Sequence, residues 1–225
     1  MCVVTWLPNL DGTCVLTTNR DISLTRPHSH PPENHNSLVY PLDPIGKGSW
    51  IAMSKSTIVC LLNAQSINTN NKFDSSRGEF VVELCTKPVE SVNEEQLVNY
   101  DAFQLIKVNI TEHKLTHIDW DSSDLIVKEI DWTKPRLWAS NTLYDERVKK
   151  QKEDRFHHVL DKQNLSLDSI LKFHGAEKID GNHDLRSPLG KKVKTTSITQ
   201  VKMNLSKAEI FYTDLLNNSI HRLKI

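Results

Sequence analysis

Two runs rich in β-branched and apolar residues, at 2–7 and 13–20, open the chain on either side of the cluster Asn9-Leu10-Asp11-Gly12. An Asn-x-Asp-Gly cluster between two such runs is typical of a β-hairpin. A turn at this cluster places Cys2 opposite Asn19 on the second strand, give or take one residue for a bulge. This pairing constrains the rest of the chain, because it decides which side chains of the second strand share a face.

Side chains alternate along a strand, so we expect Asn19 and Asp21 on one face of the hairpin and Arg20 on the other. A small residue follows the initiator methionine, and removal of Met1 would leave Cys2 with both a thiol and a free α-amine. An α-amine has a reference pKa of about 8 and can act as the base for its own side-chain nucleophile.

In such a site Asp21 would orient the amine, and Asn19 would donate to an oxyanion. A structural role for Cys2 is the alternative, since free cysteines are commonly small buried residues of a strand. One cysteine near a terminus does not separate the two interpretations.

The composition limits the class of protein. With 225 residues and no repeat or linker, the chain is expected to form a single domain over 1–225. Lys plus Arg and Asp plus Glu number 28 each, so no net charge draws the chain to nucleic acid or to an anionic membrane. The N-terminus lacks a signal-peptide pattern, and no run approaches the ~18 apolar residues of a membrane span. We therefore expect a soluble, cytoplasmic protein.

No metal site or disulfide framework is indicated. The cysteines at 2, 14, 60 and 85 lie in apolar runs without Cys-x-x-Cys spacing. Three histidines, at 28, 30 and 35, fall in a proline-rich stretch that begins at Arg26. We expect this stretch to be an irregular surface loop beside the first hairpin, which favours solvated histidines over metal ligands.

The remaining pattern consists of hairpins and helices rather than βαβ units. Further strands are predicted at 49–53, 57–63, 103–110, 114–120, 125–131, 193–203, 207–213 and 219–224. Ser-x-x-Glu capping boxes that begin at Ser76 and Ser91 predict one helix through Cys85 and a shorter one near Leu97.

Two more helices are predicted in the second half of the chain. A long amphipathic helix with a solvated, charged face follows Trp138-Ala139-Ser140-Asn141-Thr142, and a helix over 167–173 ends at Gly175. A polar loop is expected at 180–192. This element order predicts an α+β fold in which antiparallel sheets are covered by helices.

Several short motifs together resemble one known family. They are Met1-Cys2, Thr17-Thr18-Asn19-Arg20-Asp21, Arg26-Pro27, Gly48-Ser49-Trp50-Ile51, Leu61-Leu62-Asn63, Ser76-Arg77-Gly78-Glu79-Phe80, Leu137-Trp138-Ala139-Ser140-Asn141-Thr142-Leu143-Tyr144 and Lys194-Thr195-Thr196-Ser197-Ile198. In this order they are similar to the NRDE family, also called TANGO2 (transport and Golgi organisation 2), which is grouped with the N-terminal-nucleophile (Ntn) hydrolase folds. The family name spells Asn-Arg-Asp-Glu, whereas Ile22 follows Asp21 here, so a role of that glutamate does not transfer.

The resemblance implies an αββα sandwich of two mostly antiparallel sheets covered by helices. It also implies a nucleophile at the start of the first strand, which is Cys2 here. Cholylglycine-hydrolase relatives carry an Asn-x-Asp pattern on the second strand, which Asn19 and Asp21 match, but their preceding arginine is Thr18 here.

Further site residues follow from the same resemblance. Asn141 matches an asparagine on the oxyanion side, and the matched motifs make Arg20, Trp50 and Asn63 the expected substrate-binding residues. We expect the catalytic group to lie at one end of the sandwich, in a cleft partly walled by the 22–47 segment.

Two functions remain open at this point. The first is an Ntn-type hydrolase of a linear amide bond in a small acyl-amide, with Cys2 as its nucleophile. The second is a non-catalytic protein that binds or traffics haem, a lipid or an acyl-CoA in the same cleft. Neither needs a resident cofactor or a metal, and both imply a small-molecule partner rather than nucleic acid or a membrane span.

Overall fold

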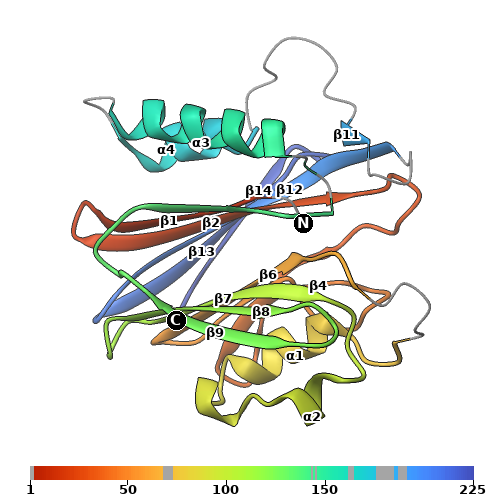
Figure 1. The fold of residues 1–225 in the computed structure, drawn as a ribbon. Helices are drawn as coiled ribbons and strands as arrows, with labels where there is room; N and C mark the ends of the chain where they lie inside the picture. The colour runs from red at the N-terminus through yellow and green to blue at the C-terminus, as the bar shows by residue number, and fades with distance from the viewer. Residues whose placement is uncertain are drawn as a thin grey trace.

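The computed structural model describes residues 3–67, 73–142, 144, 146–161, 165–175, 185–186 and 192–225. Within these ranges the strands form two sheets of seven strands each, and every pairing is antiparallel. The sheets lie face to face, and helices cover their outer faces (Figure 1). The expected αββα sandwich is confirmed.

Sheet A contains the N-terminal hairpin. Its strand order is β10-β1-β2-β12-β13-β14, with β11 paired to β12. The bounds are β1 (Val3–Leu10), β2 (Thr13–Ile22), β10 (Arg136–Ala139), β11 (Leu185–Arg186), β12 (Lys192–Asn204), β13 (Lys207–Asp214) and β14 (Ser219–Lys224).

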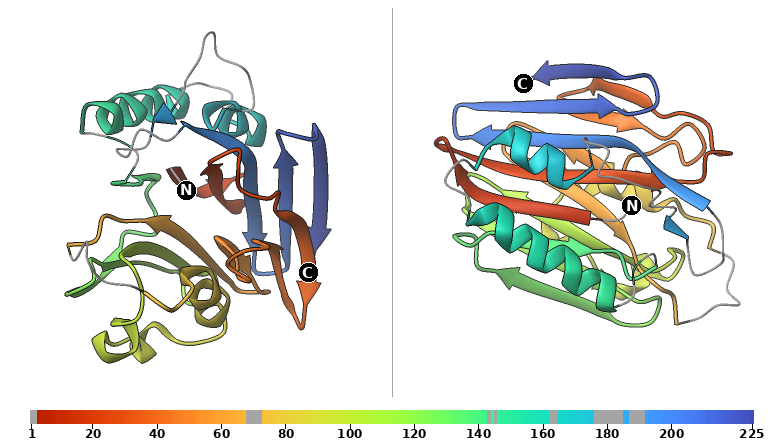
Figure 2. Two further views of the ribbon diagram at one scale, coloured as in Figure 1. Left: turned by 90° about the vertical axis from the view of Figure 1, so that its right-hand side faces the viewer. Right: turned by 90° about the horizontal axis from the view of Figure 1, so that it is seen from above.

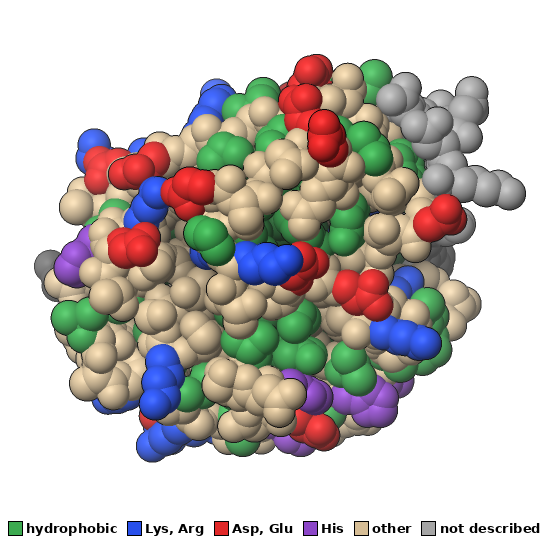
Figure 3. Space-filling model, turned by 90° about the horizontal axis from the view of Figure 1, so that it is seen from below, with side chains coloured by type: hydrophobic (Ala, Val, Ile, Leu, Met, Phe, Trp, Pro, Cys, Tyr) green, Lys and Arg blue, Asp and Glu red, His purple; other side chains and the backbone are tan. Residues whose placement is uncertain are grey.

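Sheet B is a meander in sequence order, from β3 to β9. Its strands are β3 (His30–His35), β4 (Leu38–Leu42), β5 (Ile51–Met53), β6 (Thr57–Asn63), β7 (Phe103–Asn109), β8 (Lys114–Trp120) and β9 (Leu125–Ile130). Helices α1 (Arg77–Leu84) and α2 (Glu94–Leu97), with a short 3-10 turn (Val89–Ser91) between them, lie on its outer side. Acidic and basic side chains are interspersed on the surface seen from this side (Figure 3).

Helices α3 (Glu146–Leu160) and α4 (Leu167–Phe173) lie across sheet A, as Figure 2 shows. The ends of α4 are well defined by local chemistry. Ser166 and Ser169 form a reciprocal capping box at its start, and Gly175 follows its C-cap in the left-handed conformation, with a φ of 103°.

The first hairpin forms as predicted, with Val4 opposite Thr18 and a register shift between Leu7 and Leu10. The turn residues Asp11 and Gly12 both have positive φ. Met1 and Cys2 lie outside the described residues, so the predicted pairing of Cys2 with Asn19 stays a prediction.

Alternation along β1 and β2 produces two hydrophobic cores. One set of side chains, including Trp6 and Leu16, packs between the sheets against residues of sheet B such as Ile51. The alternate set, Leu7, Leu10 and Val15, packs against Phe156 of α3 and Ile170 of α4. Because both faces of this hairpin are covered, it is buried almost throughout.

The structure corrects the expectation of an irregular loop at 26–35, because β3 begins at His30. Pro31 and Pro32 are tolerated there because β3 is an edge strand and its register shifts between His30 and Glu33. The last residue of β3, His35, stacks on Tyr40 of β4.

Smaller corrections concern strand content and caps. Strand β10, which includes Trp138, was not predicted, and β11 pairs with β12 inside the expected 180–192 loop, most of which lies outside the described residues. The predicted helix at 76–85 forms, but Ser76 does not cap it; its hydroxyl donates to the Gly46 carbonyl instead. Helix α2 is capped by Asn93 and not by Ser91.

A close approach of two backbones generates the first prediction. Ser49 N donates to the Gly78 carbonyl at 3.0 Å, so the segment at Gly48 lies directly against the first turn of α1. A Cβ at position 48 would lie 2.1 Å from the Gly78 carbonyl carbon. Gly48→Ala is therefore expected to lower the free energy of unfolding by about 3 kcal/mol, as overpacking against an immobile neighbour does.

Urea denaturation of purified variants measures this loss. Gly46→Ala in the same turn is the matched control, because its nearest contact would be the Ser76 hydroxyl at an ordinary 3.4 Å. Equal stability of the two variants would contradict the assignment of Gly48 as the site of closest approach.

Candidate functional site

The last third of β2 carries three consecutive polar residues that are nearly inaccessible to solvent. Asn19, Arg20 and Asp21 are 5%, 2% and 4% exposed. As the alternation predicted, Asn19 contacts the C-terminal end of α4, whereas Arg20 reaches the opposite face and lies over Trp50 next to sheet B. Two different polar clusters therefore flank the same strand.

The first cluster is a chain of hydrogen bonds on the helix side of sheet A. His174 Nδ1 lies 2.6 Å from Asn19 Oδ1, and Asn19 Nδ2 donates to Asp21 Oδ1 at 3.5 Å. Asp21 also accepts from the Thr195 hydroxyl at 2.5 Å and from the Tyr144 hydroxyl at 3.5 Å. We call this set the Asn19–Asp21 network.

The network defines the tautomer of His174. Burial, helped by the charge of Lys152, lowers the pKa of His174 to about 3, so the ring is neutral near pH 7. The Asn19 carbonyl oxygen can only accept, so His174 Nδ1 must carry the proton. Nε2 then accepts from the Thr5 hydroxyl at 2.9 Å. His174 thereby holds the Asn19 amide with its NH2 group toward Asp21.

Asp21 is a buried carboxylate whose contacts are with neutral donors. Its oxygens accept from Asn19, Thr195 and Tyr144, and no cation within the described ranges pairs with it. Burial of a carboxylate without a counter-charge is costly, so Asp21 is a candidate functional group. An amine that approached it would supply the missing positive charge.

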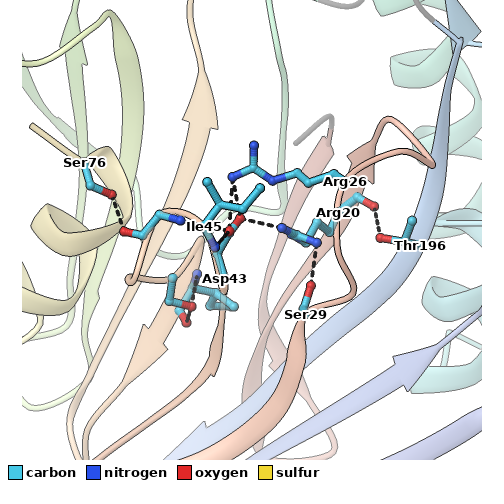
Figure 4. Close-up of polar contacts among 10 residues, drawn as sticks. Arg20, Arg26, Ser29, Asp43, Ile45, Ser76 and Thr196 are labelled. Atoms are coloured by element: carbon cyan, nitrogen blue, oxygen red, sulfur yellow. Dashed lines mark hydrogen bonds and ion pairs between the residues drawn. The ribbon is translucent and has the colours of Figure 1, made fainter. Parts of the chain in front are cut away.

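The second cluster joins Arg20 to sheet B (Figure 4). Arg20 donates to the Ser29 hydroxyl at 2.5 Å and to Asp43 Oδ2 at 2.5 Å, and its guanidinium lies 4.6 Å from the centre of the Trp50 ring. Burial lowers the pKa of Arg20 and the charge of Asp43 opposes this, while the group stays protonated. Arg20 and Trp50 thus lie together, within the protein interior.

Asn63 and Asn141 lie in segments that meet, and among the described residues neither side chain has a hydrogen bond to the Asn19–Asp21 network. Ser140 donates to the backbone carbonyl of Asn63 at 2.6 Å, which links the end of β6 to the residues after β10. The Asn141 side chain is exposed and accepts from Lys149 of α3 at 2.6 Å. Cys2 lies outside the described residues, so the expected roles of Asn63 and Asn141 beside it stay predictions.

A cavity of about 140 Å³ opens beside Arg20, on the side opposite to the Asn19–Asp21 network. The 22–47 segment supplies much of its wall, but neither Asn19 nor Asp21 lines it, so this cavity is not the cleft that was expected to hold the catalytic group. Its lining comprises Arg20, Ile22, Ser23, Leu24, Arg26, His28, Ser29, Thr196, Tyr212, Asp214 and Leu216.

Sequence patterns did not identify His174, Thr195, Tyr144 or Asp43, which contact the predicted residues from distant parts of the chain. The available signals were weak: His174 precedes the predicted C-cap glycine, and Thr195 lies in a family motif. The described portion of the chain contains no group of three or more His, Cys, Asp or Glu side chains arranged to hold a metal ion. It also contains no helix that is both long and apolar enough to cross a membrane.

Comparison with known proteins identifies the family of this chain. The family model described as Transport and Golgi organisation 2, TANGO2, matches residues 1–211. The chain belongs to the TANGO2 family. No curated protein matches it.

Solved structures similar to this TANGO2-family chain show its fold. A variant of the conjugated bile acid hydrolase from Clostridium perfringens has 14% identity and a TM-score of 0.61, over 99% of this chain and 92% of that one. Penicillin V acylase from Agrobacterium tumefaciens has 7% identity and a TM-score of 0.61, over 100% and 86%. A second variant of the bile acid hydrolase has 13% identity and a TM-score of 0.55, over 100% and 92%. The fold is therefore Ntn-hydrolase-like.

The buried His174 predicts a pH dependence of stability. Between about pH 6.5 and pH 3 the unfolded chain binds a proton at this histidine and the folded chain does not, so the free energy of unfolding must fall as the pH falls. The loss approaches about 1.4 kcal/mol per pH unit below 6.5. Urea denaturation from pH 7 to pH 5 measures it.

The matched variant is His174→Asn, which keeps an N–H donor near the position of Nδ1 but does not titrate. Its stability is expected to fall less steeply over the same range, because only the acidic groups and other histidines still contribute. Identical pH profiles for the two proteins would show that His174 already accepts a proton in the folded state.

The described cysteines generate a third prediction. Burial raises the pKa of Cys14, Cys60 and Cys85 to about 12 each, and all three are nearly inaccessible. Thiolates are the reactive form, so native protein treated with iodoacetamide at pH 7.5 is expected to be modified first at Cys2. Peptide mass spectrometry locates the label, with urea-unfolded protein as the control in which all four react. Equal labelling in the native state would argue against an activated Cys2.

Proposed function

We propose that this protein is an N-terminal-cysteine hydrolase of the amide bond in a small, linear acyl-amide. In this proposal removal of Met1 exposes Cys2, whose thiol is the nucleophile and whose α-amine is the base. The carrying observation is the buried Asp21 carboxylate, which neutral donors hold on the strand next to the one that begins at Val3. Family membership and the Ntn-hydrolase-like fold support the same assignment.

The network assigns a role to each polar group. Asp21 supplies the negative charge that orients the α-amine and stabilises its protonated form. The Asn19 amide nitrogen carries two hydrogens; one is directed at Asp21, which leaves the second for the carbonyl oxygen of a substrate. His174 acts as a positioning residue, because its Nδ1–H prevents rotation of the Asn19 amide.

The proposed reaction has two halves. The thiol proton passes to the α-amine, sulfur attacks the carbonyl carbon, and the oxygen becomes an oxyanion beside Asn19. When the C–N bond breaks, the α-ammonium returns its proton to the leaving amine, and a thioester remains. A water molecule then gives a proton to the α-amine and attacks the thioester. The C–S bond breaks, the carboxylic acid leaves, and the α-ammonium returns its proton to the sulfur, which regenerates the thiol.

Turnover by purified protein tests this function. Intact mass first establishes whether Met1 is removed. An acyl p-nitroanilide series, penicillin V and a glycine-conjugated bile acid then serve as amide probes. Cys2→Ala is expected to abolish turnover, because no nucleophile remains, and Asp21→Asn is expected to lower the rate by ~10²–10⁴-fold, because general-base help is lost. Melting temperatures of both variants should change little.

Asp154→Asn on the exposed face of α3 is the matched charge-removing control and should retain the wild-type rate. Turnover by Cys2→Ala equal to the wild type would exclude Cys2 as the nucleophile. A retained Met1 would exclude the α-amine mechanism. A wild-type protein that hydrolyses none of the probes but gives a Soret band with haem would favour the carrier function over the hydrolase.

A further inference from the structure

The two sheets end in four edge strands, which differ in how well they are protected from pairing with another chain. β3 carries Pro31 and Pro32, which lack a backbone donor, and β14 lies against β3. β10 has four residues and packs against α3. β9 has six residues without a proline, and within the described ranges it pairs with β8 alone (Figure 1). The β9 edge is therefore the least protected of the four.

The turn between β8 and β9 determines which backbone groups of β9 are directed outward. Asp121 N donates to the Asp124 carbonyl at 3.4 Å, and hydrogen-bonded pairs alternate with non-hydrogen-bonded pairs along an antiparallel ladder. The N–H and C=O groups of Val127 and Glu129 therefore point away from β8. The Leu125 N–H points the same way, because it donates to a carboxylate of α2. These groups form a template for one more strand.

The side chains of this edge combine exposed apolar groups with two charges. Ile126 and Val127 are 47% and 45% exposed, although both lie within the strand. Asp124 and Lys128 are exposed as well, and each lies two residues from Ile126, so all three share one face of the sheet. A charge on an edge strand normally opposes pairing, unless an opposite charge lies across from it.

Pairing between two copies of this edge can satisfy both charges in one register. Two identical antiparallel strands are related by a two-fold axis perpendicular to the sheet, which passes through one residue of each. With the axis at Ile126, that residue faces its own copy, Leu125 faces Val127, and Asp124 faces Lys128. With the axis at Val127, Lys128 faces Ile126, and neither charge meets its opposite. With the axis at Lys128, two like charges face each other.

We propose that the β9 edge binds the β9 edge of a second copy of this chain, antiparallel, with the two-fold axis at Ile126. The two B sheets then form one continuous sheet, and an Asp124–Lys128 pair closes each end of the contact. The Leu125 N–H exchanges its 3.4 Å contact with α2 for the Val127 carbonyl of the second copy. The inference depends neither on Cys2 nor on hydrolysis.

Sedimentation velocity of the full-length protein tests the dimer. Pairing along one short strand buries less surface than a standard interface, so measurements extend over about 5–500 μM. A reducing agent is present throughout, which excludes a disulfide-linked dimer. The sedimentation coefficient is expected to rise from the monomer value to the dimer value across this range. A protein that stays monomeric at every concentration would overturn the proposal.

Charge reversal tests the register. Asp124→Lys and Lys128→Asp are each expected to weaken self-association at least 10-fold, because each creates two like-charge contacts. An equimolar mixture of these two variants should associate again, since every reversed residue then faces an opposite charge. Val127→Pro removes an outward N–H without touching the ladder to β8 and should also be monomeric.

Lys207→Asp, at an exposed position on β13 of the other sheet, is the matched control and should dimerise as the wild type does. Circular dichroism and melting temperature check that each variant is folded. Single reversals that dimerise as well as the wild type would show that β9 is not the interface. A mixture of the two that remains monomeric would overturn the register at Ile126.

Discussion

Burial of β2 on both faces is the constraint on which the site depends. Toward the turn its side chains are mostly apolar, and they satisfy both cores by packing alone. Toward Ile22 they are polar, and a polar group in such a place must find partners or destabilise the fold. Those partners come from three other elements: His174 after α4, Thr195 on β12 and Asp43 after β4. The polar end of one strand therefore fixes how the layers meet.

Two adjacent residues of this strand carry opposite charges, and the structure compensates them differently. Arg20 is neutralised by Asp43 and lies over Trp50, which suits a role in holding the sheets together. Asp21 accepts hydrogen bonds from neutral donors, so no cation among the described residues neutralises its negative charge. A catalytic group needs this second arrangement, because its charge must act on a substrate or on another reacting group.

Family membership and fold likeness support different parts of the argument. The TANGO2 match covers most of the chain, and the solved structures cover nearly all of it at 7–14% identity. At that identity the likeness establishes the fold, while the chemistry must be argued from the side chains themselves. The Asn19–Asp21 network is the part of this chain that carries the hydrolase proposal.

The sequence by itself determined the parts of this protein that local chemistry specifies. The first hairpin follows from its turn cluster, most strands from their alternation and length, and the end of α4 from Gly175. The placement of Asn19 and Asp21 on one face, with Arg20 on the other, follows from strand period alone. The sandwich architecture was predicted from the resemblance to the TANGO2 family.

Only the tertiary structure decided which distant groups meet these residues. His174 and Thr195 lie more than 150 positions from Asn19 and Asp21 and contact them because α4 and β12 pack on β2. The proline-rich strand β3 could not be predicted, because a sheet edge removes the penalty that proline carries elsewhere. Likewise, the second guanidinium on Asp43 follows from how the 22–47 segment folds back on sheet B, which no local pattern records.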